Sequence, residues 1–273
     1  MKMKNRKLFI TGTVILILFL LLAVFAPVLA PHEPNEIVGQ SFQAPNGEHL
    51  LGTNDIGQDV LTELLYGARY SIAIGFLAMA ISVVIALTLG IISGWCGGWL
   101  DSILMKITTF FLTIPYLPLV ILLAALLKGG LITTALILGV TSWAEMAKVV
   151  RSQVLKIKKQ EYIQTIQAMG AKDGYVLTRH ILPELLSFIA YHMIIRFKSS
   201  ILAESSLSFL GLGSAVIKSW GSMLYYAQAK NAFLTASWRW LVLPPGFMIV
   251  VLIFSLMLIG YSIEGNVNPG REA

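Results

Sequence analysis

The stretch EYIQTIQAMGAKDGYVLTRHILP, Glu161–Pro183, is the longest polar run between two hydrophobic segments of this chain. Seven cationic residues lie in it or just before it: Lys148, Arg151, Lys156, Lys158, Lys159, Lys172 and Arg179. The segments on either side are apolar enough to cross a bilayer, so the stretch between them must face water. Cation-rich loops are typical of the cytoplasmic side of a membrane. The sequence therefore predicts a cytoplasmic loop between two membrane-spanning helices.

The composition indicates an all-α, polytopic membrane protein. Of the 273 residues, 56% are hydrophobic and 12% are charged, and the mean hydropathy is +0.77. A soluble domain carries about twice that charged fraction. Several stretches exceed the ~18 apolar residues that mark a spanning helix, whereas a membrane β-barrel shows alternating segments of ~10 residues. The net charge of +6 is attributed to membrane topology rather than to nucleic-acid binding.

The N-terminus is expected to be cytoplasmic. Four cations precede an apolar run at 8–30, and this run is longer than the ~7–15 residues of a signal-peptide core. An uncleaved first helix, closed by Pro27 and Pro31, is therefore favoured over a cleaved signal. The next connection, 31–70, contains six acidic residues and one cation, Arg69, which places it outside the membrane.

Five further spans follow from the apolar runs at 71–94, 103–127, 131–150, 185–207 and 244–263. The prediction is thus six spans with both termini in the cytoplasm. It divides the chain into an N-terminal helix and outer loop (1–70), a core of five spans (71–264) that contains the cytoplasmic loop (156–183), and a tail (265–273). Small residues throughout the second span predict close helix packing.

No catalytic or metal-binding motif is present in the sequence. It contains no Gly-x-x-x-x-Gly-Lys-[Ser/Thr] phosphate loop and no Gly-x-Ser-x-Gly elbow. The four histidines show no zinc-binding spacing, and Cys96, as the single cysteine, excludes an intramolecular disulfide. We therefore expect no catalytic residues, no metal site and no bound cofactor in this chain.

Four residues within the expected spans are candidates for lining a transport pathway: Pro115, Arg196, Lys198 and Glu204. The kink expected at Pro115 is either structural or part of such a pathway. The three ionisable residues either face protein or a water-filled cavity, or reach an interface by snorkelling. The aromatic residues of 211–240 form either an interfacial belt or a surface for a substrate-delivering partner.

The cytoplasmic loop itself predicts a short amphipathic helix. Tyr162, Ile163, Ile166 and Met169 are spaced to form one apolar face. Gly170 is suited to end that helix in a left-handed conformation, and Pro183 is suited to begin the next one. By spacing alone, a solvated loop without a partner remains equally compatible.

Three segments resemble the permease family of dipeptide, oligopeptide and nickel ABC importers. The first is HLLGTNDIGQDVLTELLYGARYSI (49–72), in which Asn54 and Gln58 replace the usual Asp and Arg. The second is the cytoplasmic loop, where Glu161, Gly170 and Ile181-Leu182-Pro183 match and Thr165-Ile166-Gln167 replace Ala-Ala-Arg. The third is ESSLSFLGLG (204–213). In this order, the resemblance extends over nearly the whole chain.

The resemblance implies the type I permease fold of ABC importers and the second permease subunit of a heterodimer in a prokaryotic cell membrane. It also implies two cytoplasmic ATPase subunits, which would bind ATP and Mg²⁺, and an extracytoplasmic substrate-binding protein. The residues it places in the ATPase-coupling loop are Glu161, Tyr162, Ala168, Gly170, His180, Leu182 and Pro183.

The substrate is left open by the resemblance. A peptide is the first expectation, and nickel, a metal chelate or an oligosaccharide are the alternatives. An ion-coupled secondary transporter is a further alternative, supported by Arg196, Lys198 and Glu204. A membrane enzyme would need a nucleophile–base pair, which is not apparent in the sequence.

Overall fold

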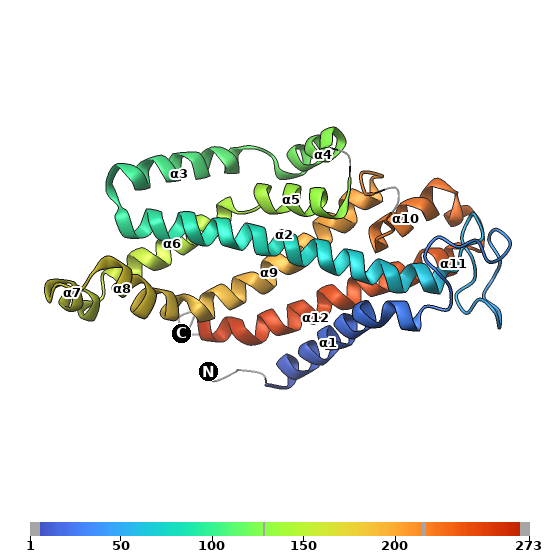
Figure 1. The fold of residues 1–273 in the computed structure, drawn as a ribbon, viewed down its shortest axis with the longest axis horizontal. Coiled ribbons are helices and arrows are strands. Elements are labelled where there is room, and N and C mark those ends of the chain that lie inside the picture. Colours follow the sequence, from blue (N-terminus) through green and yellow to red (C-terminus); the bar gives the residue numbers. More distant parts are fainter. Residues whose placement is uncertain (1–5, 128, 215–216, 268–273) are drawn as a thin grey trace.

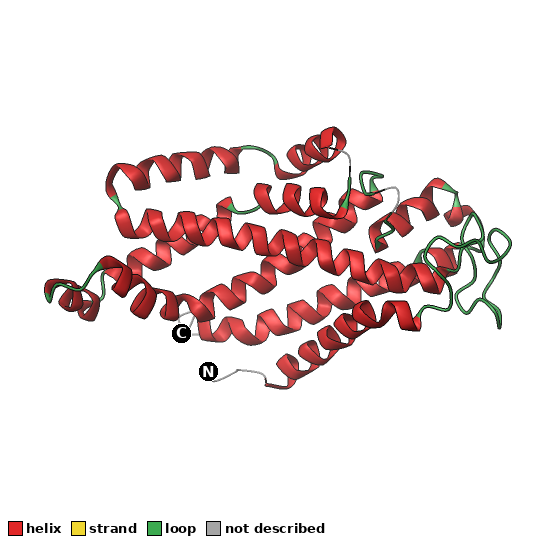
Figure 2. Cartoon of the chain, viewed as in Figure 1, coloured by secondary structure: helices red, strands yellow, loops and turns green. Residues whose placement is uncertain are grey.

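The computed structural model describes residues 6–127, 129–214 and 217–267, and most of these are helical (Figure 2). The long helices are α1 (Arg6–Leu29), α2 (Val60–Cys96), α9 (Leu182–Phe209) and α12 (Leu243–Val267). The shorter ones are α3 (Gly98–Thr113), α4 (Tyr116–Leu127), α5 (Leu131–Thr141), α6 (Ala144–Lys158), α7 (Glu161–Ala168), α8 (Asp173–Val176), α10 (Trp220–Ala229) and α11 (Trp238–Leu241). Within the described ranges there are two isolated β-bridges and no strand. This confirms the all-α class.

Helix α2 is the centre of the bundle and packs against α1, α5, α6 and α9. Glycines on α2 permit this packing. A Cβ on Gly90 would lie 2.7 Å from Cβ of Val150 on α6, and one on Gly75 would lie 2.6 Å from a side-chain carbon of Ile201 on α9. In lipid, where apolar burial does not favour association, such close approach supplies the dispersion contacts that hold helices together.

Four helical segments are long and apolar enough to span a membrane: 6–29, 60–96, 173–209 and 238–264. The expected third span is instead the bent pair α3 and α4, which meet at 84°. Ile114 is extended (φ −79°, ψ 126°), because a residue before proline avoids the helical conformation. The bend thus follows from Pro115.

The expected fourth span is divided. The apolar helix α5 ends at Thr141, and α6 begins at Ala144 after a break at Ser142–Trp143. The structure therefore supports four spans, or five with the bent pair counted as one. The six-span count stays a prediction.

Helices α7 and α8 belong to the predicted ATPase-coupling loop, called the coupling loop below, and lie at one end of the bundle (Figure 1). The connection between α1 and α2 lies at the opposite end with α10 and α11. This end is called the outer end, after the side of the membrane predicted for it. The start of α1 and the end of α12 lie toward the end that carries α7 and α8. This arrangement agrees with the predicted topology, although the side of the membrane stays a prediction. The expected tail begins within α12, and 268–273 lie outside the described residues.

Two hydrogen bonds fix the first turns of α2. Asp59 caps this helix, and its Oδ1 accepts a hydrogen bond from the Thr62 backbone N–H at 2.8 Å. Trp220 does not belong to an interfacial belt. It is fully buried, and its Nε1 donates to the carbonyl oxygen of Leu64 at 3.0 Å. A satisfied indole N–H allows the whole ring to be buried.

One further boundary differs at the first helix. Pro27 lies inside α1, which ends at Leu29. The helix therefore passes the first of the two prolines that were expected to close it.

Candidate functional site

The coupling loop is anchored on the protein core through α7 and α8. Ile163 of α7, Val176 of α8 and Ile181 just before α9 are all completely buried. They belong to the same hydrophobic cluster as Ile157 of α6 and Leu185 of α9. The loop is therefore an ordered extension of α6 and α9, and a displacement of α7 would be transmitted to both.

Two hydrogen bonds join the start of α7 to the start of α9. The Tyr162 hydroxyl donates to Oε2 of Glu184 at 2.8 Å, and the Gln160 amide Nε2 donates to Oε1 at 3.0 Å. Partial burial, and then the hydrogen bond to the Glu184 carboxylate and its negative charge, raise the pKa of Tyr162 to about 12. Tyr162 therefore stays a neutral donor throughout the physiological pH range.

Gly170 reverses the chain after α7. Its φ is +85°, a conformation that glycine adopts without the penalty imposed by a Cβ. Its N–H donates to the carbonyl oxygen of Gln167 at 2.9 Å, and that of Ala171 donates to the carbonyl oxygen of Ile166 at 3.3 Å. The predicted left-handed end of this helix is confirmed.

A π-helical turn, Leu177–Ile181, leads into α9 and was not predicted. In it the Leu182 N–H donates to the carbonyl oxygen of Leu177. Pro183 has no N–H and its ring clashes with the preceding turn of a regular helix, and a wider turn relieves that clash. Pro183 lies in the first turn of α9, as predicted, but the helical path begins earlier, at Asp173.

The tip of the coupling loop presents apolar side chains to solvent. The side chains of Met169, Tyr175 and Tyr162 are 82%, 54% and 42% exposed. Six of the expected coupling residues are exposed, whereas His180 is half-buried; the six are Glu161, Tyr162, Ala168, Gly170, Leu182 and Pro183. The His180 ring centroid lies 5.6 Å from that of Tyr175 and 6.1 Å from that of Tyr162. An exposed apolar tip on a rigid base is suited to protein docking.

A cavity of about 460 Å³ brings together two of the four candidate pathway residues, Pro115 and Arg196. Tyr116, Glu145 and Ser199 are also part of its lining. Nη2 of Arg196 donates to Oε2 of Glu145 at 2.8 Å, whereas its buried Nε has no hydrogen-bond partner among the described residues. The cavity is therefore lined by a guanidinium that is paired with a carboxylate through Nη2, while its Nε is shielded from solvent.

The other two candidates lie elsewhere. Lys198 lines a separate cavity of about 200 Å³, which also borders α12. Glu204 is completely buried and accepts a hydrogen bond from Ser208 at 2.8 Å. Neither residue lines the cavity of Pro115 and Arg196.

A buried polar cluster at the outer end was not anticipated. Lys218 donates to the side chains of both Glu63 and Gln58. Asn54 donates to Oε1 of Glu63 at 2.7 Å and to Oε1 of Gln58 at 2.9 Å. Lys218 and Glu63 are 155 residues apart, so no spacing rule in the sequence indicates this pair. The cluster fastens the segment before α10 to the start of α2.

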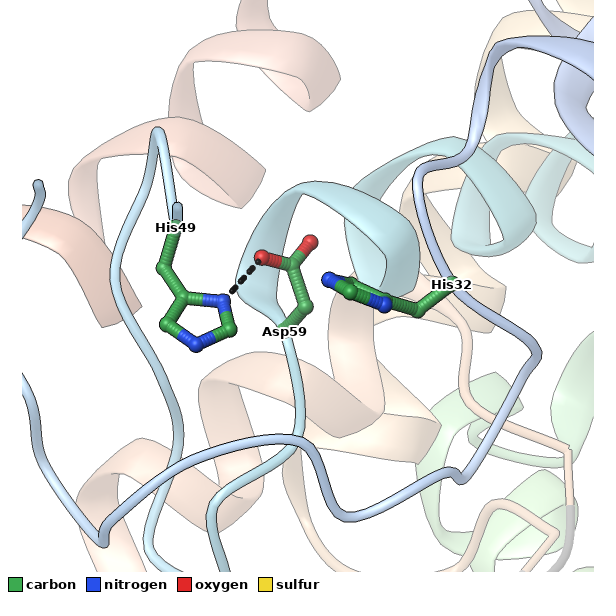
Figure 3. A group of neighbouring side chains, drawn as sticks. All are labelled: His32, His49 and Asp59. Atoms are coloured by element: carbon green, nitrogen blue, oxygen red, sulfur yellow. Dashed lines mark hydrogen bonds and ion pairs between the residues drawn. The ribbon is translucent and has the colours of Figure 1, made fainter. Parts of the chain in front are cut away.

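A second group at the outer end consists of His32, His49 and Asp59 (Figure 3). Their potential metal-ligand atoms all lie within 4.8 Å of one another. The sequence predicted no metal site, because these residues are not spaced as in a known motif.

Comparison with known proteins identifies the class. Residues 86–270 match the family model of the binding-protein-dependent transport system inner membrane component. Residues 1–48 match the N-terminal TM domain of oligopeptide transport permease C. The chain is therefore a multi-pass membrane component of an ABC importer, and hydrolysis of ATP belongs to a separate subunit.

Individual relatives narrow the class. The dipeptide transport system permease protein DppC of Bacillus subtilis is 36% identical, with 98% of this chain and 83% of the relative covered. The oligopeptide transport system permease protein OppC of Bacillus subtilis is 34% identical, with 98% of this chain and 88% of the relative covered. The chain belongs to this permease family.

A solved structure supports the fold. It describes inward-facing conformations of the MetNI methionine ABC transporter and matches with a TM-score of 0.57 at 18% identity. The match covers 74% of this chain and 97% of the other.

Proposed function

We propose that this chain pairs with a second permease subunit to form a pathway for peptides delivered by an extracytoplasmic binding protein. Two ATPase subunits, which would carry ATP and Mg²⁺, dock at the coupling loop on the cytoplasmic side, where both termini of this chain also lie. The observation that carries the proposal is the exposed apolar tip of the loop on a buried base. Relatives named for dipeptide and oligopeptide transport favour peptides over nickel, metal chelates or oligosaccharides.

The coupling loop acts as a lever in this proposal. Closure of the ATPases moves α7, and the buried contacts of Ile163 and Ile181 oblige α6 and α9 to follow as rigid bodies. The bonds from Tyr162 and Gln160 to Glu184 resist rotation of α7 against α9. Because α9 carries Arg196, the movement reaches the cavity of Pro115 and Arg196 directly.

The docking role is tested by Glu161→Lys. Glu161 is exposed at the first position of α7, where a negative charge favours the helix and a positive charge opposes it. In a pull-down of the tagged chain from solubilised native membranes, the variant should retain the second permease and lose the ATPases. Peptide uptake should fall at least tenfold.

The matched control is Glu48→Lys, the same charge reversal at an exposed acid in the outer connection. It should retain the second permease and the ATPases. Recovery of the wild-type chain alone, or normal uptake by Glu161→Lys, would contradict the docking role.

Arg196 is proposed to contact the carboxylate of a passing peptide. Arg196 lines the cavity, and a guanidinium has five N–H donors in a planar arrangement that matches a carboxylate. Arg196→Gln should reduce uptake of a peptide with a free C-terminal carboxylate about tenfold, and uptake of its C-terminal amide much less. Lys198→Gln removes a cation two positions away that lines the other cavity, and should affect the two peptides equally. Equal losses for both peptides in Arg196→Gln would overturn the assignment.

A further inference from the structure

We propose that His32, His49 and Asp59 form a binding site for a divalent transition-metal ion of the zinc class at the outer end of the protein. Asp59 lies between the two imidazole rings (Figure 3). Nδ1 of His49 is 3.2 Å from Oδ2 of Asp59, and a ring nitrogen of His32 completes a set of atoms within 4.8 Å of one another.

The spacing already fits part of a coordination shell. In a tetrahedral zinc site with bonds of ~2.0–2.1 Å, neighbouring ligand atoms lie about 3.3 Å apart. The His49–Asp59 separation therefore needs no adjustment. His32 needs to approach by no more than about 1.5 Å, and it lies in the irregular connection after α1 rather than in a helix.

The surroundings orient the ligands. Oδ1 of Asp59 accepts from the backbone N–H and the hydroxyl of Thr62 at 2.8 and 3.0 Å, which leaves Oδ2 directed at His49. Such supporting hydrogen bonds are typical of metal sites. His49 and Asp59 are buried and His32 is half-buried, so the side of His32 offers an entry path from solvent.

The donor set selects the ion. Two imidazole nitrogens and one carboxylate oxygen suit zinc and its neighbours in the first transition series, whereas calcium and magnesium prefer all-oxygen shells. A simple His49–Asp59 hydrogen bond is the alternative explanation of the pair. It does not involve the second imidazole, whose ring centroid lies 5.7 Å from that of His49.

A bound ion would tie the connection after α1 to the first residues of α2. Both segments lie at the end of the bundle opposite α7. Because the ion would bind the folded state only, it would raise the melting temperature in proportion to the logarithm of its concentration. The site would thus stabilise the outer surface without taking part in transport.

The test uses the whole chain, purified in detergent by an affinity tag that contains no histidine. A chelator first removes any bound metal from the protein. Zn²⁺ titration by calorimetry should show one saturable site, and Co²⁺ should produce the visible absorption of a tetrahedral complex. His32→Ala should weaken Zn²⁺ binding at least tenfold and abolish the melting-temperature increase with Zn²⁺. His180→Ala, which removes a half-buried histidine from the coupling loop, should leave both unchanged.

A second variant distinguishes loss of metal binding from loss of folding. Asp59→Asn retains a side-chain oxygen for the helix cap and removes the anionic ligand, so it should also lose binding while eluting normally in size-exclusion chromatography. Absence of saturable binding in the wild type, or wild-type affinity in folded His32→Ala, would overturn the proposal.

Discussion

Gly170 shows how a single backbone conformation shapes the coupling loop. Its positive φ turns the chain from α7 toward α8, and a Cβ there would meet no other atom within 4 Å. The requirement for glycine is therefore conformational and not steric. A local rule could predict it because the conformation depends on Gly170 and its immediate neighbours.

Gly170→Ala should destabilise this turn. A left-handed conformation costs an L-residue about 1–2 kcal/mol, which corresponds to roughly five- to thirtyfold faster hydrogen exchange of the α7 amides if they exchange by local opening. The matched control is Gly174→Ala, which also adds a Cβ into open space but lies within α8, where alanine is the better helix former. Hydrogen-exchange mass spectrometry of both variants checks the prediction, and equal exchange in the two would refute the conformational explanation.

The residue scale also shows where local rules stop. Pro115 was expected to break the third span, and it does so because Ile114 is forced to be extended. Pro183 was expected simply to begin a helix, and the π-helical turn before it was missed. Proline at the start of a helix usually needs no such adjustment, and the wider turn is required here because the helical path already begins at Asp173, ten residues before Pro183.

At the scale of elements, the outer end of the bundle is held by contacts between distant segments. The Lys218–Glu63 pair is largely shielded, with side chains 16% and 9% exposed. The resemblance indicated unusual residues at Asn54 and Gln58, and the structure shows both in the cluster of this pair. Such a pair could not be predicted from either segment alone.

Lys218→Met should reveal how strongly this cluster stabilises the protein. Removing one partner leaves the carboxylate of Glu63 buried without its counter-charge, which costs about 3–5 kcal/mol. Lys230→Met is the control, because the Lys230 side chain is 50% exposed and its pair with Asp55, at 3.1 Å, is more open to solvent than the Lys218–Glu63 pair, so its loss should cost less. Thermal unfolding in detergent should show a much lower melting temperature for Lys218→Met alone. Similar values for both variants would contradict this role.

Some membrane spans were predicted correctly from the sequence, and others were not. Long apolar helices such as α1, α2 and α12 were identified from hydropathy, because lipid imposes that pattern on any exposed span. The break at Ser142–Trp143 interrupts an apolar run without a proline or glycine between α5 and α6. It could therefore not be located from composition.

At the scale of the whole molecule, the two ends of the helical bundle carry different elements, and the proposed function uses both. One end carries α7 and α8, and the other carries the outer connection with α10 and α11 (Figure 1). The cavity of Pro115 and Arg196 is lined by α3, α4 and α9 together with residues near the α5–α6 break. The sequence predicted the loop, but it grouped Lys198 and Glu204 with these residues because hydropathy does not show which way a helix faces.

The most direct test of the account is site-specific cross-linking of the assembled transporter. Cys96 is exposed and is first replaced by serine. A cysteine at Met169, 82% exposed on the coupling loop, is then compared with one at Leu234, 84% exposed between α10 and α11. Met169→Cys should cross-link to an ATPase subunit and change in yield with ATP, whereas Leu234→Cys should not reach the ATPase. Cross-linking of the ATPase from Leu234→Cys, or its absence from Met169→Cys, would contradict the proposed coupling role of the loop.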